Sequence, residues 1–181
     1  TYRFDGTWRQ IACLQHEMSS CEPCYSWNVF HSHQLGDRYR FLEGMYSLFA
    51  GSLSRKTYTH VETRGGQAGL TPALLPLYMM RLAVIDDQLE QGRLHLLRLV
   101  PSAWIHPDKE TAFERMPTRY GPVTLRFRLD DATRELSVSY EPDYRHTPEL
   151  VTLHIPRHQG IERLILNGVT VDVGKRSAIA L

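Results

Sequence analysis

The hydrophobic pattern of this chain changes its period once, and this change limits the folds that the chain can adopt. Up to about residue 90, apolar residues recur every three or four positions, as on one face of a helix. From Leu94 onward they alternate with polar residues, as in a half-buried strand. The segment 94–129 therefore joins a helical part to a strand part. We predict an α+β fold, with a helical segment over residues 1–90 and strands over residues 91–181.

Two stretches of the first part carry the clearest helix signals. Segment 37–53 presents one apolar stripe, which is formed by Tyr39, Leu42, Met45, Tyr46, Phe49 and Leu53. A second helix is predicted from Pro72 to about Ile85, because Thr71 can cap it and proline fits the first helical position. This helix is apolar almost all round, which is typical of burial on every side. Since the first part offers few partners to cover it, we expect further chain upstream of Thr1.

The second part of the chain predicts several short strands joined by turns. After a short strand that begins at Leu94, the alternating segments are 123–129, 136–140, 150–155, 161–166 and 169–173. The polar run 130–133 forms a turn, and Asn167-Gly168 is a strong hairpin signal. Short strands of this kind, with one polar face, are typical of an antiparallel β-sandwich.

Composition and charge exclude two classes of partner. The chain has 181 residues, of which 21 are basic and 20 acidic, and its net charge is +1. Such a balance creates no long-range field that would attract nucleic acid or an anionic membrane. No apolar run approaches the roughly 20 residues that span a bilayer. We therefore expect neither nucleic acid nor a membrane as a partner.

The loop 58–66 places three side chains capable of chemistry within five positions. His60, Glu62 and Arg64 precede two glycines, and loops held by a rigid scaffold often carry catalytic groups. A carboxylate beside an imidazole and a guanidinium can act as a general acid or base, or can bind sugar hydroxyls. We predict Glu62 and His60 as catalytic residues and Arg64 as a substrate-binding residue. The alternative is a solvated loop in which Glu62 caps a helix.

A second candidate group lies where a short helix can begin, at residues 27–31. Trp27 can stack on the face of a sugar ring while Asn28 and His31 bind its hydroxyls. We predict these three residues as substrate-binding. In the alternative interpretation Trp27 belongs to the helical core.

Cysteines and histidines near the N-terminus raise the question of a metal site. Cys21 and Cys24, with His16 before them and His31 and His33 after them, are residue types that zinc accepts. Only six residues separate Cys24 from His31, whereas structural zinc sites usually separate their ligand pairs by about a dozen. Buried thiols with surface histidines are favoured, so we predict no metal and no cofactor. Three cysteines also leave the cytoplasm and the periplasm equally open.

Two further features lie in the strand part. Trp104 follows Pro101 in the junction, and we expect its indole to be a buried wedge between the helical layer and the sandwich. Tyr140, Tyr144 and their neighbours Arg145 and His146 gather at a strand end. That group can bind a saccharide, but surface tyrosines are also common in ordinary loops.

The junction resembles one found in large bacterial glycoside-hydrolase-like proteins. The resemblance rests on Leu96-Leu97, Pro101 and Trp104, followed by the sequence PTRYGPV at 117–123. In those proteins a toroid of paired helices, the (α/α)6 barrel, precedes a β-sandwich tail. The chain departs from them after the Trp turn, where a glycine is common and the segment 106–109 stands here.

This resemblance implies carbohydrate chemistry on an oligo- or polysaccharide. The chain would be the C-terminal portion of such a protein, in which residues 1–90 supply the last hairpins of the toroid and part of the sugar-binding cleft. Residues 91–181 would form the structural β-sandwich, and the upstream part of the polypeptide would complete the toroid. The alternative is a non-catalytic carbohydrate-binding or protein-interaction module. Whether this chain is itself an enzyme stays open at this point.

Overall fold

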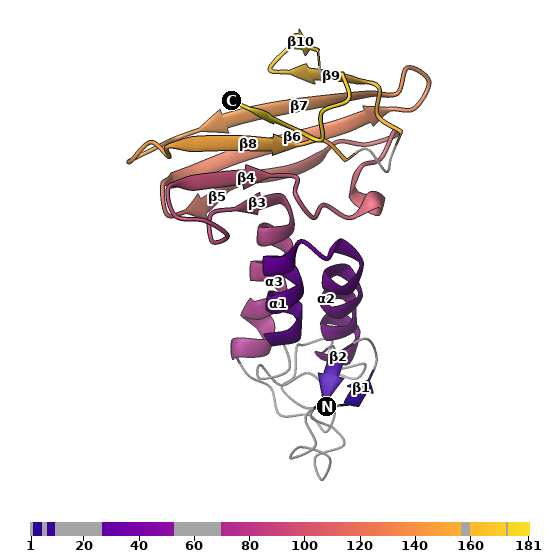
Figure 1. Ribbon diagram of the computed structural model, residues 1–181, viewed down its shortest axis with the longest axis vertical. Coiled ribbons are helices and arrows are strands. Elements are labelled where there is room, and N and C mark those ends of the chain that lie inside the picture. The colour runs from indigo at the N-terminus through magenta and orange to yellow at the C-terminus, as the bar shows by residue number, and fades with distance from the viewer. Residues whose placement is uncertain (1, 5–6, 10–26, 53–69, 157–159, 173) are drawn as a thin grey trace. The chain divides into compact units, whose positions relative to one another are not determined.

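The computed structural model describes residues 2–4, 7–9, 27–52, 70–156, 160–172 and 174–181. The chain divides into two compact units, Thr1–Met80 and Arg81–Leu181, whose elements are labelled in Figure 1. Segment 81–90, which the hydrophobic pattern groups with the helices, belongs to the unit that contains the sheets. The helices of the described residues, together with the two mostly antiparallel sheets of the second unit, make this an α+β protein, as predicted.

The first unit contains a strand pair and helices. Strands β1 (Tyr2–Phe4) and β2 (Thr7–Arg9) pair antiparallel and were not predicted. Helix α1 (Trp27–Leu35) and helix α2 (Arg38–Ser52) confirm the two helices expected there. Gly36, with a φ of 72°, ends α1, and the Asp37 carboxylate accepts a hydrogen bond from the Arg40 amide at the start of α2.

Helices α1 and α2 approach closely at one glycine. A Cβ atom on Gly44 would lie 2.6 Å from a methyl carbon of Val29, so the packing of these helices requires the missing side chain. Phe41 and Met45 of α2 are fully buried, and the Phe41 ring lies 5.9 Å from the imidazole of His33. The stripe predicted for segment 37–53 is only partly right, because Met45 is buried but Tyr39 and Tyr46 are 75% and 44% exposed. Phe41, which the predicted stripe did not include, is buried instead.

Helix α3 (Leu70–Val84) begins two residues before the predicted start. The expected burial on every side is wrong, because Leu74 and Leu77 are 53% and 61% exposed. A helix that is apolar all round needs neighbours on all sides, and in the described residues only its last turns are buried in this way, as Leu82 is. None of the described helices has the length and apolar character needed to cross a membrane.

The second unit contains two sheets. One has the strand order β10-β9-β7-β6-β5 and the other the order β11-β8-β4-β3. The strands are β3 (Ile85–Asp86), β4 (Arg93–Leu96), β5 (Thr111–Thr118), β6 (Gly121–Asp130), β7 (Glu135–Pro142), β8 (Leu150–His154), β9 (Arg163–Leu166), β10 (Val169–Val171) and β11 (Ala178–Ala180). Most neighbours run antiparallel, but β4 pairs with β8, and β7 with β9, in parallel.

Most of the predicted strands are confirmed, and the misses have physical causes. The predicted hairpin at Asn167-Gly168 forms with a φ of 48° and 81° at the two residues, as a type I′ turn requires. Strand β5 was not predicted, because a register shift between Phe113 and Met116 interrupts its alternation. Strand β3 was taken as the end of a helix, since it follows α3 without a loop.

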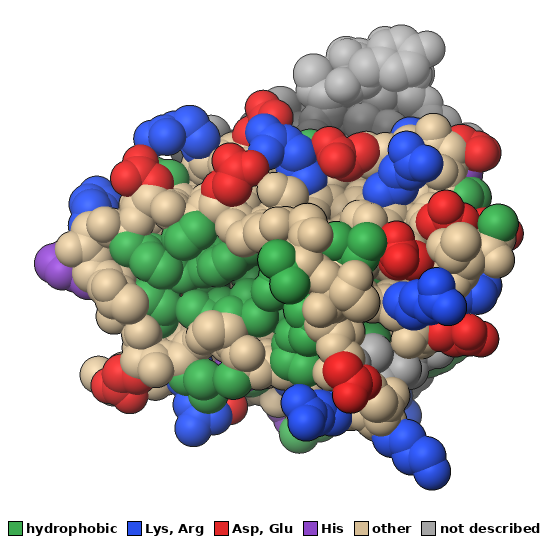
Figure 2. All heavy atoms as spheres, turned by 90° about the horizontal axis from the view of Figure 1, so that it is seen from above, with side chains coloured by type: hydrophobic (Ala, Val, Ile, Leu, Met, Phe, Trp, Pro, Cys, Tyr) green, Lys and Arg blue, Asp and Glu red, His purple; other side chains and the backbone are tan. Residues whose placement is uncertain are grey.

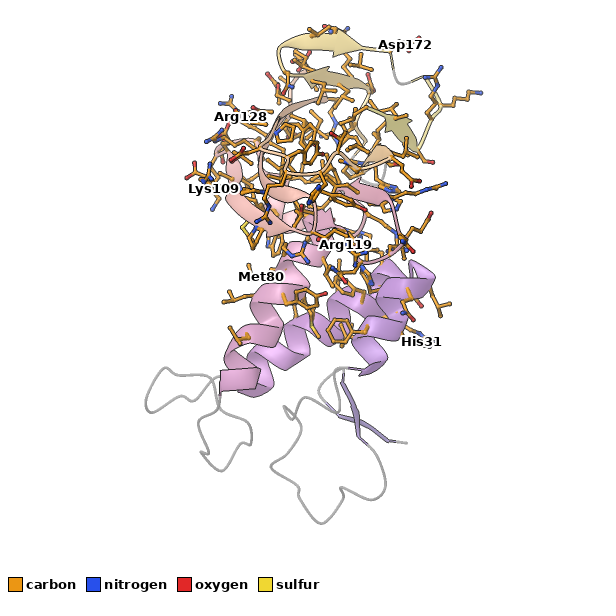
Figure 3. The ribbon with its side chains drawn as sticks, turned by 90° about the vertical axis from the view of Figure 1, so that its left-hand side faces the viewer. His31, Met80, Lys109, Arg119, Arg128 and Asp172 are labelled. Carbon is orange, nitrogen blue, oxygen red and sulfur yellow. The ribbon has the colours of Figure 1, made fainter. Side chains whose placement is uncertain are left out.

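Alternation in β6 shows how the second unit forms its core. Val123, Leu125, Phe127 and Leu129 are buried, whereas the intervening Arg128 and Asp130 are exposed. Figure 3 shows Arg128 and Lys109 at the outer surface of this unit. Figure 2 shows another face, on which apolar side chains gather inside a rim of charged ones.

The expected buried wedge at Trp104 is wrong. Trp104 lies in a single 3-10 turn, Ser102–Trp104, and is half-buried. Its ring lies 5.9 Å from that of Phe113 on β5, and its carbonyl accepts a 2.5 Å hydrogen bond from the Thr111 hydroxyl. The indole therefore packs on strand β5 from outside the core, because the turn that carries it lies at the surface.

Replacing Trp104 with alanine should lower the free energy of unfolding by only about 1–2 kcal/mol, since a half-buried ring loses less contact area than a core ring. Phe127→Ala is the matched control, because Phe127 is 1% exposed and should cost about 3–5 kcal/mol. Urea denaturation of both variants measures the difference. Equal losses would show that Trp104 is part of the core.

Candidate functional site

The predicted catalytic residues lie outside the described residues. This holds for His60 and Glu62, and also for Arg64, which was predicted to bind substrate. Trp27 and Asn28 are the first two residues of α1, and their side chains are likewise outside the description. His31 follows on the same helix and is exposed, as Figure 3 shows. The predicted site therefore stays a prediction.

The hypothetical zinc ligands are divided in the same way. His16, Cys21 and Cys24 lie outside the described residues, while His33 is buried beside Phe41 and His31 is exposed. Within the described part of the chain, no group of three or more His, Cys, Asp or Glu side chains is placed to hold a metal ion. The structure brings together other polar groups, all in the second unit.

The first of these groups is centred on the buried carboxylate of Asp87. Arg81, in the last turn of α3, places its guanidinium 2.9 Å from Asp87 Oδ1, and both side chains are less than a tenth exposed. The Arg119 amide, in the turn between β5 and β6, donates to Asp87 Oδ2 at 2.6 Å. Gln88 donates its side-chain amide to Oδ1 at 2.9 Å. One carboxylate thus connects the helix end to the sheet; we call Arg81, Asp87 and the Arg119 amide the joint.

The turn that Arg119 occupies is itself tightly hydrogen bonded. Thr118 donates its hydroxyl to the Gly121 carbonyl at 2.6 Å and accepts from the Tyr120 amide at 3.1 Å. The Tyr120 carbonyl accepts from the amides of Arg145 and His146. Gly121 has a φ of 132°, and a Cβ atom there would lie 2.4 Å from the Asp143 carbonyl oxygen. The threonine and the glycine of the sequence PTRYGPV are therefore explained by the hydrogen bonds and the backbone conformation of this turn.

The second group lies on one face of the four-stranded sheet. Nδ1 of His95 on β4 is 3.1 Å from Nε2 of His154 on β8, which is a hydrogen bond between two imidazoles. Asp86, opposite His95 on β3, is fully buried and lies 3.8 Å from the Arg98 guanidinium. The Glu90 carboxylate approaches His95 Nε2 at 3.8 Å. We call His95 and His154 the imidazole pair.

Burial keeps the imidazole pair neutral near pH 7. It lowers the pKa of His154 to about 4, and the neighbouring His95 acts in the same direction. Burial also lowers the pKa of His95, although Asp86 and Glu90 oppose the change. His95 Nε2 is buried without a hydrogen-bond partner among the described residues. Such a pair can exchange protons.

The third group consists of tyrosines at the end of β7. The hydroxyls of Tyr140 and Tyr144 contact each other, and burial raises the pKa of both phenols. Tyr120 carries a buried hydroxyl with no partner in the described part of the chain. Tyr140 is buried, so the alternative in which these residues are ordinary surface tyrosines of a loop is wrong for Tyr140. Arg145 and His146 are exposed.

Sequence analysis missed the imidazole pair, although it left a signal. Both histidines stand between apolar residues, as Leu94-His95-Leu96 and Leu153-His154-Ile155. Alternation places each histidine on the face opposite its neighbours. What the pattern does not contain is the parallel pairing of β4 with β8, which aligns His95 with Thr152 and brings His154 beside it.

Comparison of this chain with protein-family models, with curated proteins and with solved structures finds no match. The interpretation of the site therefore depends on its own chemistry.

Asp87→Asn should lower the free energy of unfolding by about 3 kcal/mol, because it removes the negative charge that pairs with the buried Arg81 guanidinium. Asp143→Asn is the matched control: Asp143 pairs with Arg115, and both side chains are more than two-thirds exposed, so the loss should stay below about 1 kcal/mol. Chemical denaturation measures both. A small loss at Asp87 would mean that the joint contributes little to stability.

Gly121→Ala should cost about 2–4 kcal/mol of unfolding free energy, since the added methyl meets a carbonyl oxygen and the φ is unfavourable for other residues. Gly168→Ala separates the two causes. Gly168 has a φ of 81° but nothing within 4 Å of the added Cβ, and should cost only about 1 kcal/mol. Equal thermal shifts in the two variants would show that the close approach at Gly121 is unimportant.

Proposed function

We propose that this chain is the C-terminal portion of a carbohydrate-active, glycoside-hydrolase-like protein. In this proposal the sheets form a β-sandwich whose role is structural, and the helices are the last hairpins of an α/α toroid that holds the sugar. The observation that supports the proposal is the joint. The residues that carry the resemblance, above all the turn 117–123, are engaged in fastening the sheets to the end of α3.

In this proposal the turn 117–123 has a structural role, and the helical part of the chain carries the chemistry. Arg119 contributes its backbone amide to the joint, and Gly121 permits the close approach of backbone in the same turn. Catalytic side chains are commonly carried by loops of a rigid scaffold, because such loops hold side chains in reproducible positions. We therefore place the chemistry in the loop 58–66, with Glu62 as acid or base, His60 beside it and Arg64 on the sugar. Trp27, Asn28 and His31 would line the same cleft.

Hydrolysis of a glycosidic bond requires a second carboxylate. Retaining and inverting enzymes place two carboxyl groups about 5–10 Å apart across the bond that is cleaved. In the proposed protein the partner of Glu62 comes from the upstream part of the toroid. The oligo- or polysaccharide is then bound between surfaces of one polypeptide.

A second candidate function is a non-catalytic module that binds a carbohydrate or another protein. The apolar patch with its charged rim in Figure 2 favours this alternative, since contiguous exposed apolar surface commonly marks a binding site. The two functions differ in their dependence on Glu62, which lies in a different unit from the patch.

Glu62→Gln in the intact protein should reduce the release of reducing sugar from a panel of polysaccharides by at least about 100-fold, because an amide neither donates nor accepts the required proton. The melting temperature should change little. Glu162→Gln is the control, since Glu162 is exposed in the second unit, and it should keep full activity. Unchanged turnover in the Glu62 variant would contradict the catalytic assignment. Binding of the same polysaccharides without any hydrolysis would favour the module.

A further inference from the structure

The imidazole pair connects two strands that are far apart in the sequence. His95 lies on β4 and His154 on β8, 59 positions later, and their ring centroids are 5.3 Å apart. Strand β4 continues into the backbone that covers the end of α3, where the Leu97 amide donates to the Val84 carbonyl at 2.8 Å. The pair therefore lies beside the segment that joins α3 to the sheets.

A hydrogen bond between two imidazoles has a strict proton requirement. One ring nitrogen must carry a proton and the other must be bare. The neutral pair satisfies this, and so does a pair with one added proton. A second added proton leaves two N–H groups facing each other at 3.1 Å and two positive charges in a part-buried site.

The charged groups around the pair decide where the first proton binds. Asp86 on β3 and Glu90 in the following turn face His95, and Glu90 Oε1 lies 3.8 Å from its Nε2. Arg93 and Arg98 oppose a positive charge there, and Arg98 also opposes one on His154. Ala178, which pairs with His154 from β11, is uncharged, and so is Thr152, which lies two residues before His154 on β8. His95 thus has two carboxylates near it, whereas His154 has only the influence of Asp86.

We propose that the imidazole pair is a proton-sensitive latch between β4 and β8, which accepts one proton on His95 and opens when a second proton binds His154. Opening removes the polar link between the strands and weakens the attachment of the β3–β4 hairpin to the sheet. In the four-stranded sheet β4 lies between β3 and β8, so its pairing with β8 is what attaches the β3–β4 hairpin to the rest of the sheet. The latch is closed at neutral pH and loosens in acid.

The direction of the pH dependence follows from linkage. An unfolded histidine has a pKa of about 6.5, and the pKa of His154 in the folded chain is lowered to about 4. A lowered pKa means that the unfolded state binds the proton more readily. The stabilisation is therefore complete above about pH 6.5 and is lost progressively as the pH falls towards 4.

The test compares urea denaturation of the whole chain at pH 7.5 and pH 5.0 for three proteins. In the wild type the unfolding equilibrium constant should rise on the order of tenfold more, between these pH values, than in His154→Gln. The glutamine amide keeps a hydrogen bond to His95 but does not titrate. His146→Gln is the control, because His146 is exposed in the same unit, and it should follow the wild type. Equal pH dependence in all three proteins would overturn the proposal.

Imidazole nitrogen NMR of the wild type gives a second test that does not depend on the folding of a variant. His95 should take up its proton first, and His154 should remain neutral down to about pH 4 to 5. Glu90→Gln should move the titration of His95 to lower pH, because it removes a facing carboxylate. Two independent titrations near pH 6.5, unaffected by Glu90→Gln, would show that the rings do not interact and that no latch exists.

Discussion

The ion pair between Arg81 and Asp87 is the constraint on which the second unit depends. A helix that runs into a sheet without a loop must satisfy its last carbonyl groups and fix the direction of the strand that follows. The amides of Leu97 and Leu99 donate to the last carbonyls of the helix, those of Val84 and Ala83. Arg81 fixes the strand that follows, since its guanidinium pairs with Asp87 and donates to the Ile85 carbonyl at 3.3 Å. Through the Arg119 amide, the same carboxylate sets where the β5–β6 turn lies. A buried pair of this kind contributes little net stability compared with an apolar pair, but it specifies one arrangement.

The consecutive carboxylates of Asp86 and Asp87 have different hydrogen-bond partners. Asp87 points to the joint, while Asp86 accepts from the amides of Gln88 and Leu89 and so shapes the turn that leads to β4. The chain then bends at Leu97, whose φ of 58° is unfavourable for leucine by about 1–2 kcal/mol. This conformation is offset by burial of the side chain and by the hydrogen bond to Val84, which satisfies a carbonyl at the end of α3.

Where the sequence carries a periodic signal, it predicts the fold well. The helix over segment 37–53, the alternation in β6 and the Asn167-Gly168 turn each express a local rule, and each is confirmed. The buried face of that helix was predicted less well, since Tyr39 and Tyr46 are exposed. In the turn, Asn167 also pairs its side-chain amide with both backbone groups of Tyr140, a contact that no local rule predicts. Strand β5 was missed because its bulge breaks the period. Trp104 was placed too deep because its size and apolar character alone carry no information on depth.

The polar clusters were missed for a different reason, which also explains their value to the fold. Apolar alternation in β4 and β8 is the same after a shift of two residues, so Leu94 and Leu96 would pack equally well in either register. The histidines are sensitive to such a shift, because the observed register places His154 diagonally across from His95 and within hydrogen-bond distance of it. A shift that moves the rings apart would leave buried ring nitrogens unpaired, at a cost comparable to a lost hydrogen bond. Side chains that specify a long-range register in this way carry little local signal, so they become visible only when the strands are seen paired.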